Sequence, residues 1–586
     1  MPSIYSQKSE TSKSSHGTSS TTNTKSKSIR NMFTNNKRKG PLSILKNGSS
    51  DNADRTDNAT RRGGRSNPSN NRRDPPAGNT VEEKEISKFN DKGNEFFGRA
   101  EYNAALRMYS EALKLLKNTN IVMDEANNYE NDIVDGGDDG DCYYMPTAMR
   151  RFRTARCLVN VGAVHIRRDN YKDAISALEL SMRQSGLVTT SSSHYYQIRA
   201  SEVMADALEN IGLVLFKQTK FDKSSVMYMD ALDARRKCLD LMDASSSKNY
   251  KKKGSSSKSA EELAKLREER NSSMLELSVT LFYISLLRER QDNITEAVNY
   301  CEEALSTRRE VIPNAKLDPN SLNLFSTIGR LYCHEDVKRY RDALSYFHEV
   351  HRMKCEVAGR EHLDVVPSLN SIAFIYNQLG DYKKCIVISD RAIDIATNGR
   401  GLNKETCVAY ANRGDAHRNL EDYDKAVTTY EMALETQEKC LEENDMMNAE
   451  VHEKLAETYL LSNDMERAVA SMKDSMGVKR STLGPDSEEL ARSYSKLGEF
   501  YKRSGEYPSS IKYHTRALRV FKHHDRKEMA ATEHNKIAGI LKLSGEPNKA
   551  MEHYMAALWH SREARLPSTD PIVADTIKNV ASFRKG

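Results

Sequence analysis

One arrangement of small and aromatic residues recurs along this chain and constrains its fold more than any other feature. In the segment GEFYKRSGEYPSSIKYHTRAL, which starts at Gly498, an aromatic residue follows the first glycine after three and nine positions, and a small residue follows after twelve and nineteen. The spacing starts at ten reference positions; five copies have weaker aromatics, and the copy at Gly329 is stretched by about two residues. The ten positions are Gly93, Gly162, Gly212, Ser285, Gly329, Ala373, Gly414, Ala456, Gly498 and Ala538. The five weaker copies start at Gly162, Ser285, Ala373, Ala456 and Ala538.

The spacing has a physical reason. Small residues at the reference position and twelve residues later, such as Gly414 and Ala426, let two antiparallel helices approach closely, and the aromatic residue between them fills the turn. The small residue nineteen positions on, such as Ala433, packs the second helix against the next unit. We therefore predict an all-α fold: a right-handed superhelical solenoid of about ten helical hairpins. The low mean hydropathy of −0.72 suits a solenoid, because each unit buries little beyond its contacts with its neighbours.

The pattern resembles the tetratricopeptide repeat. The last seven reference positions are 44, 44, 41, 42, 42 and 40 residues apart. Units of this length, with phrases such as LGPDSEELARSYSKLGEFY and HLDVVPSLNSIAFIYNQLGDY, are similar to the kinesin light chain repeat group over roughly residues 263–566. The resemblance implies a protein-binding scaffold or adaptor that holds extended or helical peptides in a concave groove, without catalysis or a cofactor. The long heptad segment expected of a kinesin light chain is absent from residues 1–80.

The composition of the segments predicts the domain organisation. Residues 1–80 are rich in Ser, Thr and Asn and carry 15 Lys and Arg against 5 Asp and Glu, so we expect a disordered basic tail. The predicted segments are the tail (1–80), the first repeat (81–117), an acidic loop (118–149), repeats two and three (150–242), a Ser/Lys-rich loop (243–262), repeats four to ten (263–566) and a C-terminal capping helix (567–586).

The tetratricopeptide resemblance also predicts a binding surface. In such grooves, the first helix of each unit faces inward through the positions two or three before the reference residue and one or four after it. These positions hold Asn160, Asn210, Asn370, Asn412, Asn535, Lys496, Lys502, Lys536 and Lys542. Asparagine amides can both donate to and accept from a peptide backbone, although such residues can also merely solvate a helix. The eighth unit carries Glu453 and Glu457 instead, so we expect acidic ligand residues toward the C-terminal units.

The tail supports an alternative function. Residues Ser43, Ile44, Leu45 and Lys46 match a short motif by which regulators dock on type-1 protein phosphatase, and the basic clusters KRK and RRGGR suit nuclear import or RNA contact. The alternative is therefore a nucleic-acid-associated or phosphatase-associated regulator that acts through the tail. Nucleic acid remains the secondary partner class, and salt-sensitive retention that disappears on deletion of residues 1–80 would favour it.

Other function classes lack their signatures. We expect no enzyme activity, because the sequence shows no phosphate loop and no nucleophile elbow, and we expect no small-molecule substrate. Cys333, His334, His348, His351 and Cys355 lie near one another but without the spacing of metal-ligand pairs, so no metal is predicted. The first unit resembles the repeats of co-chaperones that grip a terminal carboxylate with two asparagines and three cations. Asn94 and Asn160 match the two asparagines, but the positions of the three cations hold no Lys or Arg, so we do not expect this mode of binding. Nine scattered cysteines and the lack of a long apolar run predict a cytoplasmic protein without membrane insertion, with the nucleus as the alternative.

Overall fold

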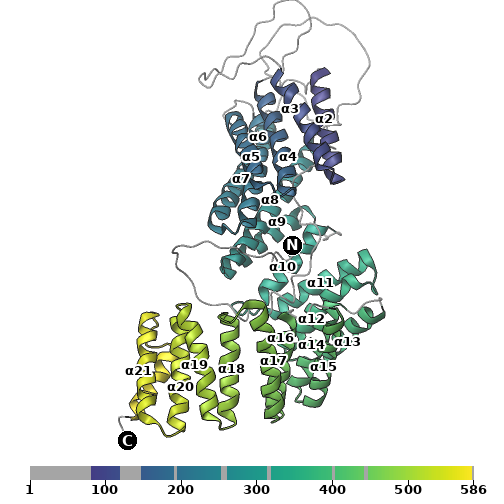
Figure 1. The fold of residues 1–586 in the computed structure, drawn as a ribbon. Helices are drawn as coiled ribbons and strands as arrows, with labels where there is room; N and C mark the ends of the chain where they lie inside the picture. The colour runs from purple at the N-terminus through teal and green to yellow at the C-terminus, as the bar shows by residue number, and fades with distance from the viewer. Residues whose placement is uncertain are drawn as a thin grey trace, which may run out of the picture. The chain divides into compact units, whose positions relative to one another are not determined.

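A computed structural model of the chain describes residues 81–118, 147–189, 194–251, 260–312, 318–398, 403–440 and 446–583. Within these ranges every regular element is helical, and successive helices pair into hairpins (Figure 1). The all-α solenoid predicted from the repeat spacing is therefore confirmed. The tail at 1–80 and most of the acidic loop lie outside the described residues.

The helices divide into two compact units, and the division falls between Leu331 and Tyr332. The N-terminal unit contains α2 (Val81–Gly98), α3 (Tyr102–Asn118), α4 (Thr147–Arg167), α5 (Tyr171–Val188), α6 (His194–Lys217), α7 (Phe221–Lys251), α8 (Ala260–Arg290), α9 (Ile294–Val311) and α10 (Pro319–Tyr332). Even-numbered helices are the first helices of the hairpins, and odd-numbered helices are the second helices.

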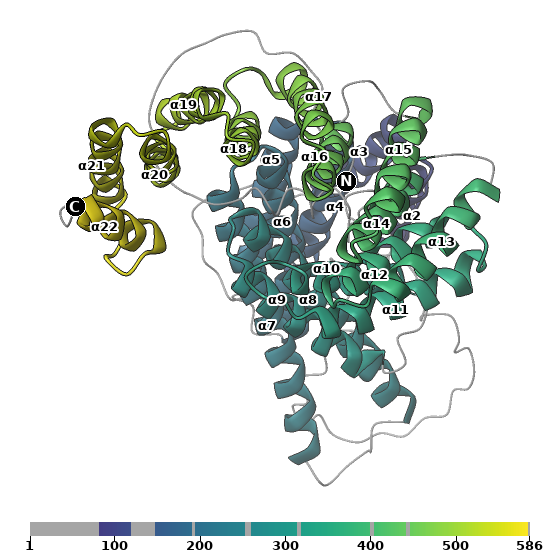
Figure 2. The same ribbon diagram turned by 90° about the horizontal axis from the view of Figure 1, so that it is seen from below.

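The C-terminal unit repeats the same hairpin. It contains α11 (Tyr340–Ala358), η1 (Leu363–Val365), α12 (Val366–Gln378), α13 (Tyr382–Asn398), α14 (Lys404–Asn419), α15 (Tyr423–Cys440), α16 (Met446–Leu461), α17 (Met465–Leu483), α18 (Glu488–Arg503), α19 (Tyr507–His523), α20 (Lys527–Leu543), α21 (Pro547–Glu563) and α22 (Pro571–Phe583). Seen along the helices, α14, α16 and α18 form one layer and α15, α17 and α19 form the other (Figure 2).

Glycine at a reference position provides room for a ring on the second helix. A Cβ atom added to Gly414 would lie 2.5 Å from Cε1 of Tyr430, a fully buried residue. The Tyr430 hydroxyl donates to Oδ1 of Asp415 at 2.6 Å, so the ring is held from both ends. In the ninth unit, His514 takes the place of the tyrosine and is fully buried against Gly498.

The hairpin turns share one backbone feature, although their residues differ. In all ten units, one residue shortly after the reference position has a positive φ; examples are Thr219, Glu421 and Gly505, at 61°, 63° and 79°. In nine units the next backbone N–H then donates to a carbonyl five residues back, as Asp422 does to His417 at 2.9 Å; in the longer turn of the fifth unit, Arg339 donates to Tyr332 instead. The hydrogen bond across five residues is the one that closes a Schellman motif, and it ends the first helix at a fixed place.

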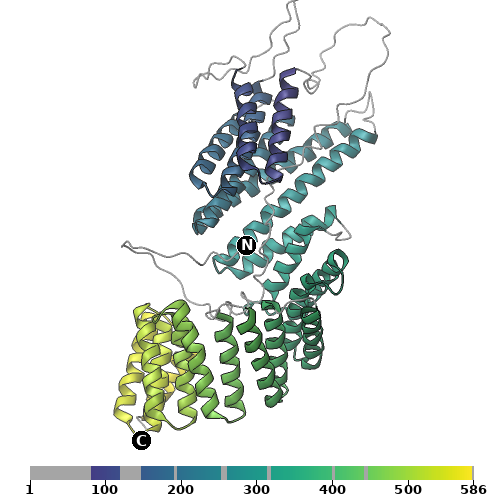
Figure 3. The ribbon, with the colours of Figure 1, turned by 45° about the vertical axis from the view of Figure 1, so that its right-hand side comes forward.

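Two long helices depart from the predicted loop boundaries. The segment 243–262 was expected to be a loop, but α7 continues to Lys251 and α8 begins at Ala260. The sequence AEELAKLREER at the start of α8 consists of strong helix formers, which explains the extension. The two helices lie side by side (Figure 3), and the Arg270 Nε donates to Oδ1 of Asp243 at 2.8 Å.

The last helix, α22, occupies the place of the next first helix. It packs against α20 and α21, and Val580 contacts the apolar cluster around Ile537 and Tyr554. Its polar contacts to α20 come from Asn535, which donates to the Ile572 carbonyl at 3.2 Å and to the Thr576 hydroxyl. Helix α22 thus covers the apolar edge that the tenth hairpin would otherwise leave open.

Candidate functional site

The structure places two of the predicted groove asparagines between neighbouring first helices. The Asn412 amide on α14 donates to the Asn370 carbonyl on α12 at 3.1 Å, and the Asn370 amide donates to the Glu405 carbonyl at 2.9 Å. Asn412 is fully buried, and Asn370 is 3% exposed. The structure thus gives both amides a role in joining α12 to α14.

The side-chain amides of the other three asparagines also donate hydrogen bonds within the chain. Asn160 donates to Oδ1 of Asn94 at 3.4 Å, which joins α4 to α2, and Asn210 donates to the Asp206 carbonyl in its own helix at 2.9 Å. Asn535 holds α22, as described above. The role of these five residues as peptide ligands stays a prediction, and their observed contacts favour a structural role.

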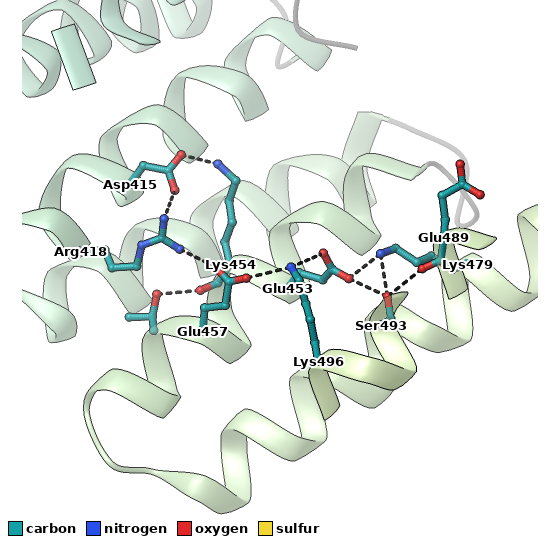
Figure 4. Close-up of polar contacts among 10 residues, drawn as sticks. Asp415, Arg418, Glu453, Lys454, Glu457, Lys479, Glu489, Ser493 and Lys496 are labelled. Carbon is teal, nitrogen blue, oxygen red and sulfur yellow. Dashed lines mark hydrogen bonds and ion pairs between the residues drawn. The ribbon is translucent and has the colours of Figure 1, made fainter. Parts of the chain in front are cut away.

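Charged residues join the next three first helices. We call this set the charge chain; it consists of Asp415 and Arg418 on α14, Glu453, Lys454 and Glu457 on α16, Lys479 on α17 and Lys496 on α18 (Figure 4). The two innermost pairs are Lys454 with Asp415, and Lys479 with Glu453. Sequence reasoning identified the two glutamates and Lys496 but missed the other four. The signal existed, because Asp415, Arg418 and Lys454 occupy inward positions of their own units.

Glu453 is the most tightly held carboxylate of the charge chain. It accepts hydrogen bonds from Lys479 at 2.5 Å, Ser493 at 2.7 Å and Lys496 at 3.2 Å. Burial alone would raise the pKa of Glu453, but Lys479 and Lys496 outweigh burial and lower the pKa to about 2. The carboxylate therefore stays ionised at neutral pH, and it links helices α16, α17 and α18.

The solvent side of the charge chain is formed by Glu457 and its two cations. Oε1 of Glu457 lies 2.9 Å from Nζ of Lys496, and its Oε2 lies 3.2 Å from Nη1 of Arg418. The side chains of Lys496 and Glu457 are 43% and 39% exposed, whereas that of Arg418 is 19% exposed. These are the groups through which the charge chain can meet a partner.

The remaining predicted lysines follow the charge chain toward the C-terminus. Lys502 lies 3.5 Å from Glu499 in its own helix. Lys536 on α20 donates to the Ser495 hydroxyl on α18 at 2.7 Å and to Glu533 at 3.1 Å. Lys542 is exposed at the end of α20. The structure thus brings Lys536 to the joint between α18 and α20 and leaves Lys502 and Lys542 at the surface.

Two of the Cys and His residues considered as metal ligands contact each other or a serine. Nε2 of His351 lies 3.4 Å from Sγ of Cys355, and its Nδ1 lies 3.0 Å from the Ser368 hydroxyl. Across the part of the chain that the structure describes, no three His, Cys, Asp or Glu residues are arranged to hold a metal ion. None of the described helices is both long and apolar enough to span a membrane. The candidate phosphatase-docking residues Ser43 to Lys46 lie outside the described residues.

Comparison with known proteins supports the repeat assignment. The tetratricopeptide repeat family model matches residues 364–439 and 445–523, which contain the whole charge chain. No curated protein matches the chain significantly.

Several solved structures are similar to parts of this chain. BtubC from P. vanneervenii is 19% identical, with a TM-score of 0.35, over 40% of this chain and 94% of BtubC. Repeats described as those of a Podosopora anserina kinesin light chain are 16% identical, with a TM-score of 0.32, over 35% of this chain and 100% of that structure. The apo form of RapI is 13% identical, with a TM-score of 0.36, over 50% of this chain and 99% of RapI.

Proposed function

We propose that this chain, a tetratricopeptide repeat protein of the long-repeat type that resembles the kinesin light chain group, is a non-catalytic scaffold that binds segments of partner proteins. The observation that carries the proposal is the inward-facing polar surface of α14, α16, α18 and α20. Its solvent-accessible lysines are Lys496 and the half-buried Lys502 on α18, and Lys542 on α20, the first helices of two consecutive units. Such a row of cations favours an acidic partner segment.

The surface suits reversible binding because its charges are only partly neutralised. Lys496 pairs with Glu457 and Lys502 pairs with Glu499, and the two side chains of each pair are about equally exposed, so solvent screens both pairs. An anionic group of a partner protein can therefore displace these carboxylates from the lysines without a large cost for breaking the pairs. Lys496 also contacts the more buried Glu453 at 3.2 Å. Buried pairs such as Lys479 with Glu453 are not exchangeable in this way and maintain the geometry of the surface.

The test replaces the exposed lysines by glutamine. The triple variant Lys496→Gln, Lys502→Gln, Lys542→Gln should lose most protein partners captured from cells at physiological salt, because the surface loses three cations. The matched control carries Lys383→Gln, Lys473→Gln and Lys512→Gln, which are exposed on the second helices α13, α17 and α19. Equal capture by both variants, with unchanged helicity, would contradict the proposal.

A second measurement separates the alternative, a regulator that acts through the basic tail. Proximity labelling compares the full chain with residues 81–586. Protein partners that disappear only when the tail is deleted, type-1 phosphatase included, would belong to the tail, and salt-sensitive retention on nucleic acid tests the nucleic-acid alternative. Partners that disappear only in the lysine variant would belong to the solenoid surface. Localisation in the cytoplasm or the nucleus stays a prediction, which imaging of the same two chains tests.

A further inference from the structure

The charge chain contains more cations than anions. Its cations are Arg418, Lys454, Lys479 and Lys496, and its anions are Asp415, Glu453 and Glu457. The two buried carboxylates have their own lysines: Asp415 is paired with Lys454, and Glu453 with Lys479. The other two cations, Arg418 and Lys496, meet at the carboxylate of Glu457. Each also lies near one of the paired carboxylates, because Arg418 is 3.4 Å from Asp415 and Lys496 is 3.2 Å from Glu453.

Arg418 and Lys496 form a two-cation site, and the carboxylate of Glu457 occupies it as a bound anion would. One of its oxygens faces Lys496 at 2.9 Å and the other faces Arg418 at 3.2 Å, and the two cations come from helices α18 and α14 on either side. Because Glu457 is 39% exposed, its carboxylate can move into water, and the less exposed Arg418 then keeps Asp415, 3.4 Å away, as its counter-ion.

We propose that Glu457 is an internal occupant of this site, and that the external group which replaces it is a phosphate on a side chain of a partner protein. The inference rests on the proposed scaffold function and specifies the chemistry of its ligand. Glu457 is part of the chain, so an external carboxylate of equal charge must compete with a tethered one and also loses the entropy of association. A singly charged acidic residue gains nothing in this exchange.

A phosphate has two advantages over the carboxylate. It carries a charge of about −1.5 to −2 at pH 7, whereas the Glu457 carboxylate carries −1. The phosphate therefore balances the two positive charges of Arg418 and Lys496 better than Glu457 does. Its three oxygens can accept two N–H groups from the planar guanidinium of Arg418 and a third hydrogen bond from Lys496. Asp415 and Glu453 do not oppose this binding strongly, because Lys454 and Lys479 already neutralise them.

The experiment measures binding of fluorescein-labelled peptides to the full chain by anisotropy. Three peptides share one Gly/Ser-rich sequence and differ at one central residue, which is phosphoserine, glutamate or serine. We expect the phosphoserine peptide to bind at least about fivefold more tightly than the glutamate peptide. The Glu457→Gln variant should bind it at least about threefold more tightly than the wild type, because the internal competitor is gone.

Matched variants separate the site from a general change in charge. Glu466→Gln makes the same charge change on the exposed side of α17 and should leave phosphopeptide affinity within about twofold. Lys496→Gln, at an exposed position that does not threaten the fold, should abolish the preference for phosphoserine over glutamate. Inorganic phosphate at the peptide's concentration should not displace the peptide.

Three results would overturn the inference: equal effects of Glu457→Gln and Glu466→Gln, equal binding of the phosphoserine and glutamate peptides, or no phosphopeptide binding by either the wild type or Glu457→Gln. Displacement by equimolar inorganic phosphate would also contradict it, because the partner would then be free phosphate. If the chain still captured partners through Lys502 and Lys542 in that case, the scaffold function would stand and only the phosphate assignment would fall.

Discussion

Gly414 has no room for a side chain, because the ring of Tyr430 fills the space where a Cβ atom would lie. We expect Gly414→Ala to reduce the free energy of unfolding by roughly 1–3 kcal/mol, as overpacking of a core does. Tyr430 cannot move away easily, since its hydroxyl is bonded to Asp415. Thermal or denaturant unfolding followed by circular dichroism measures the change.

The control for this substitution is a glycine in open space. Gly477 lies inside α17, and an added Cβ would meet nothing within 4 Å. Gly477→Ala should therefore increase stability by about 0.5–1 kcal/mol, because alanine loses less entropy in a helix. A loss of stability at both positions, or at neither, would contradict the close-packing explanation.

Sequence reasoning predicted the ten reference positions because they require small residues, but it did not predict two other features at the residue scale. The positive φ in each turn occurs at residues as different as Thr219, Glu421 and Gly505, so no residue type marks it. The sequence predicted that the asparagines lie on the inward face, but it did not predict their hydrogen-bond partners. Whether Asn412 meets a peptide or Asn370 depends on how closely α12 and α14 approach, which a pattern within one helix does not encode.

The joint between α16, α17 and α18 depends on one buried carboxylate. Glu453→Gln should reduce the free energy of unfolding by about 3–5 kcal/mol, because Lys479, which is 7% exposed, would remain buried without its anion. Lys496→Gln, at the exposed end of the same network, should cost less than about 1 kcal/mol. Denaturant unfolding at pH 7 compares the two, and the double variant Glu453→Gln with Lys479→Met should recover much of the loss. Failure of that recovery would contradict the ion-pair account.

In the last hairpin, α20 with α21, His534 contacts two other histidines. The rings of His534 and His553 approach with their Nδ1 atoms 3.0 Å apart, and the ring of His560 stacks on His534. Burial lowers the pKa of His534 from 6.5 to about 3, with further contributions from Lys522 and the other two histidines. Between these two pH values the unfolded chain binds more protons than the folded chain, so stability decreases as the pH falls below 6.5.

This arrangement predicts a pH-dependent last hairpin. Between pH 7 and pH 5, the wild type should lose about 1–2 kcal/mol that His534→Leu does not lose, because the variant has no imidazole to protonate. Hydrogen exchange of α20 and α21 at both pH values measures the local effect. The exposed His523→Gln variant should keep the wild-type pH dependence. A steeper or equal pH dependence in His534→Leu would contradict the assignment.

The described helices of the molecule form two compact units, and the C-terminal one has apolar clusters of its own. We therefore expect the fragment Tyr332–Gly586 to fold when it is produced alone, with a helical circular dichroism spectrum and a cooperative thermal transition. A shorter fragment that starts at Met446 should melt at a lower temperature, because it exposes Val451 and Leu455, which pack in a cluster with Tyr430. An unfolded Tyr332–Gly586 fragment would show that the unit cannot stand alone.

At this scale the sequence predicted the number, order and type of the hairpins, because each hairpin is specified by contacts among residues close in sequence. It did not reveal the chemistry that joins successive first helices, because those contacts connect residues about forty positions apart, such as Asn419 with Asn377 or Lys454 with Asp415. The predicted lysines were correctly placed on first helices, but the finding that Lys496 already has two carboxylate neighbours came only from the structure.

The variety of these joints has a consequence for how the chain reaches its native state. An amide connects α12 to α14, and ion pairs connect α14 to α16 and α16 to α18. A serine, a glutamate and a lysine connect α18 to α20. Similar repeats can misfold by docking one unit out of order, since apolar helix faces are interchangeable. Here, a hairpin docked against the wrong neighbour would leave a buried amide or charge without its partner. Each pair of adjacent hairpins thus has its own set of polar contacts, which a different hairpin cannot make. This specificity disfavours misfolded states in which the hairpins dock one unit out of register.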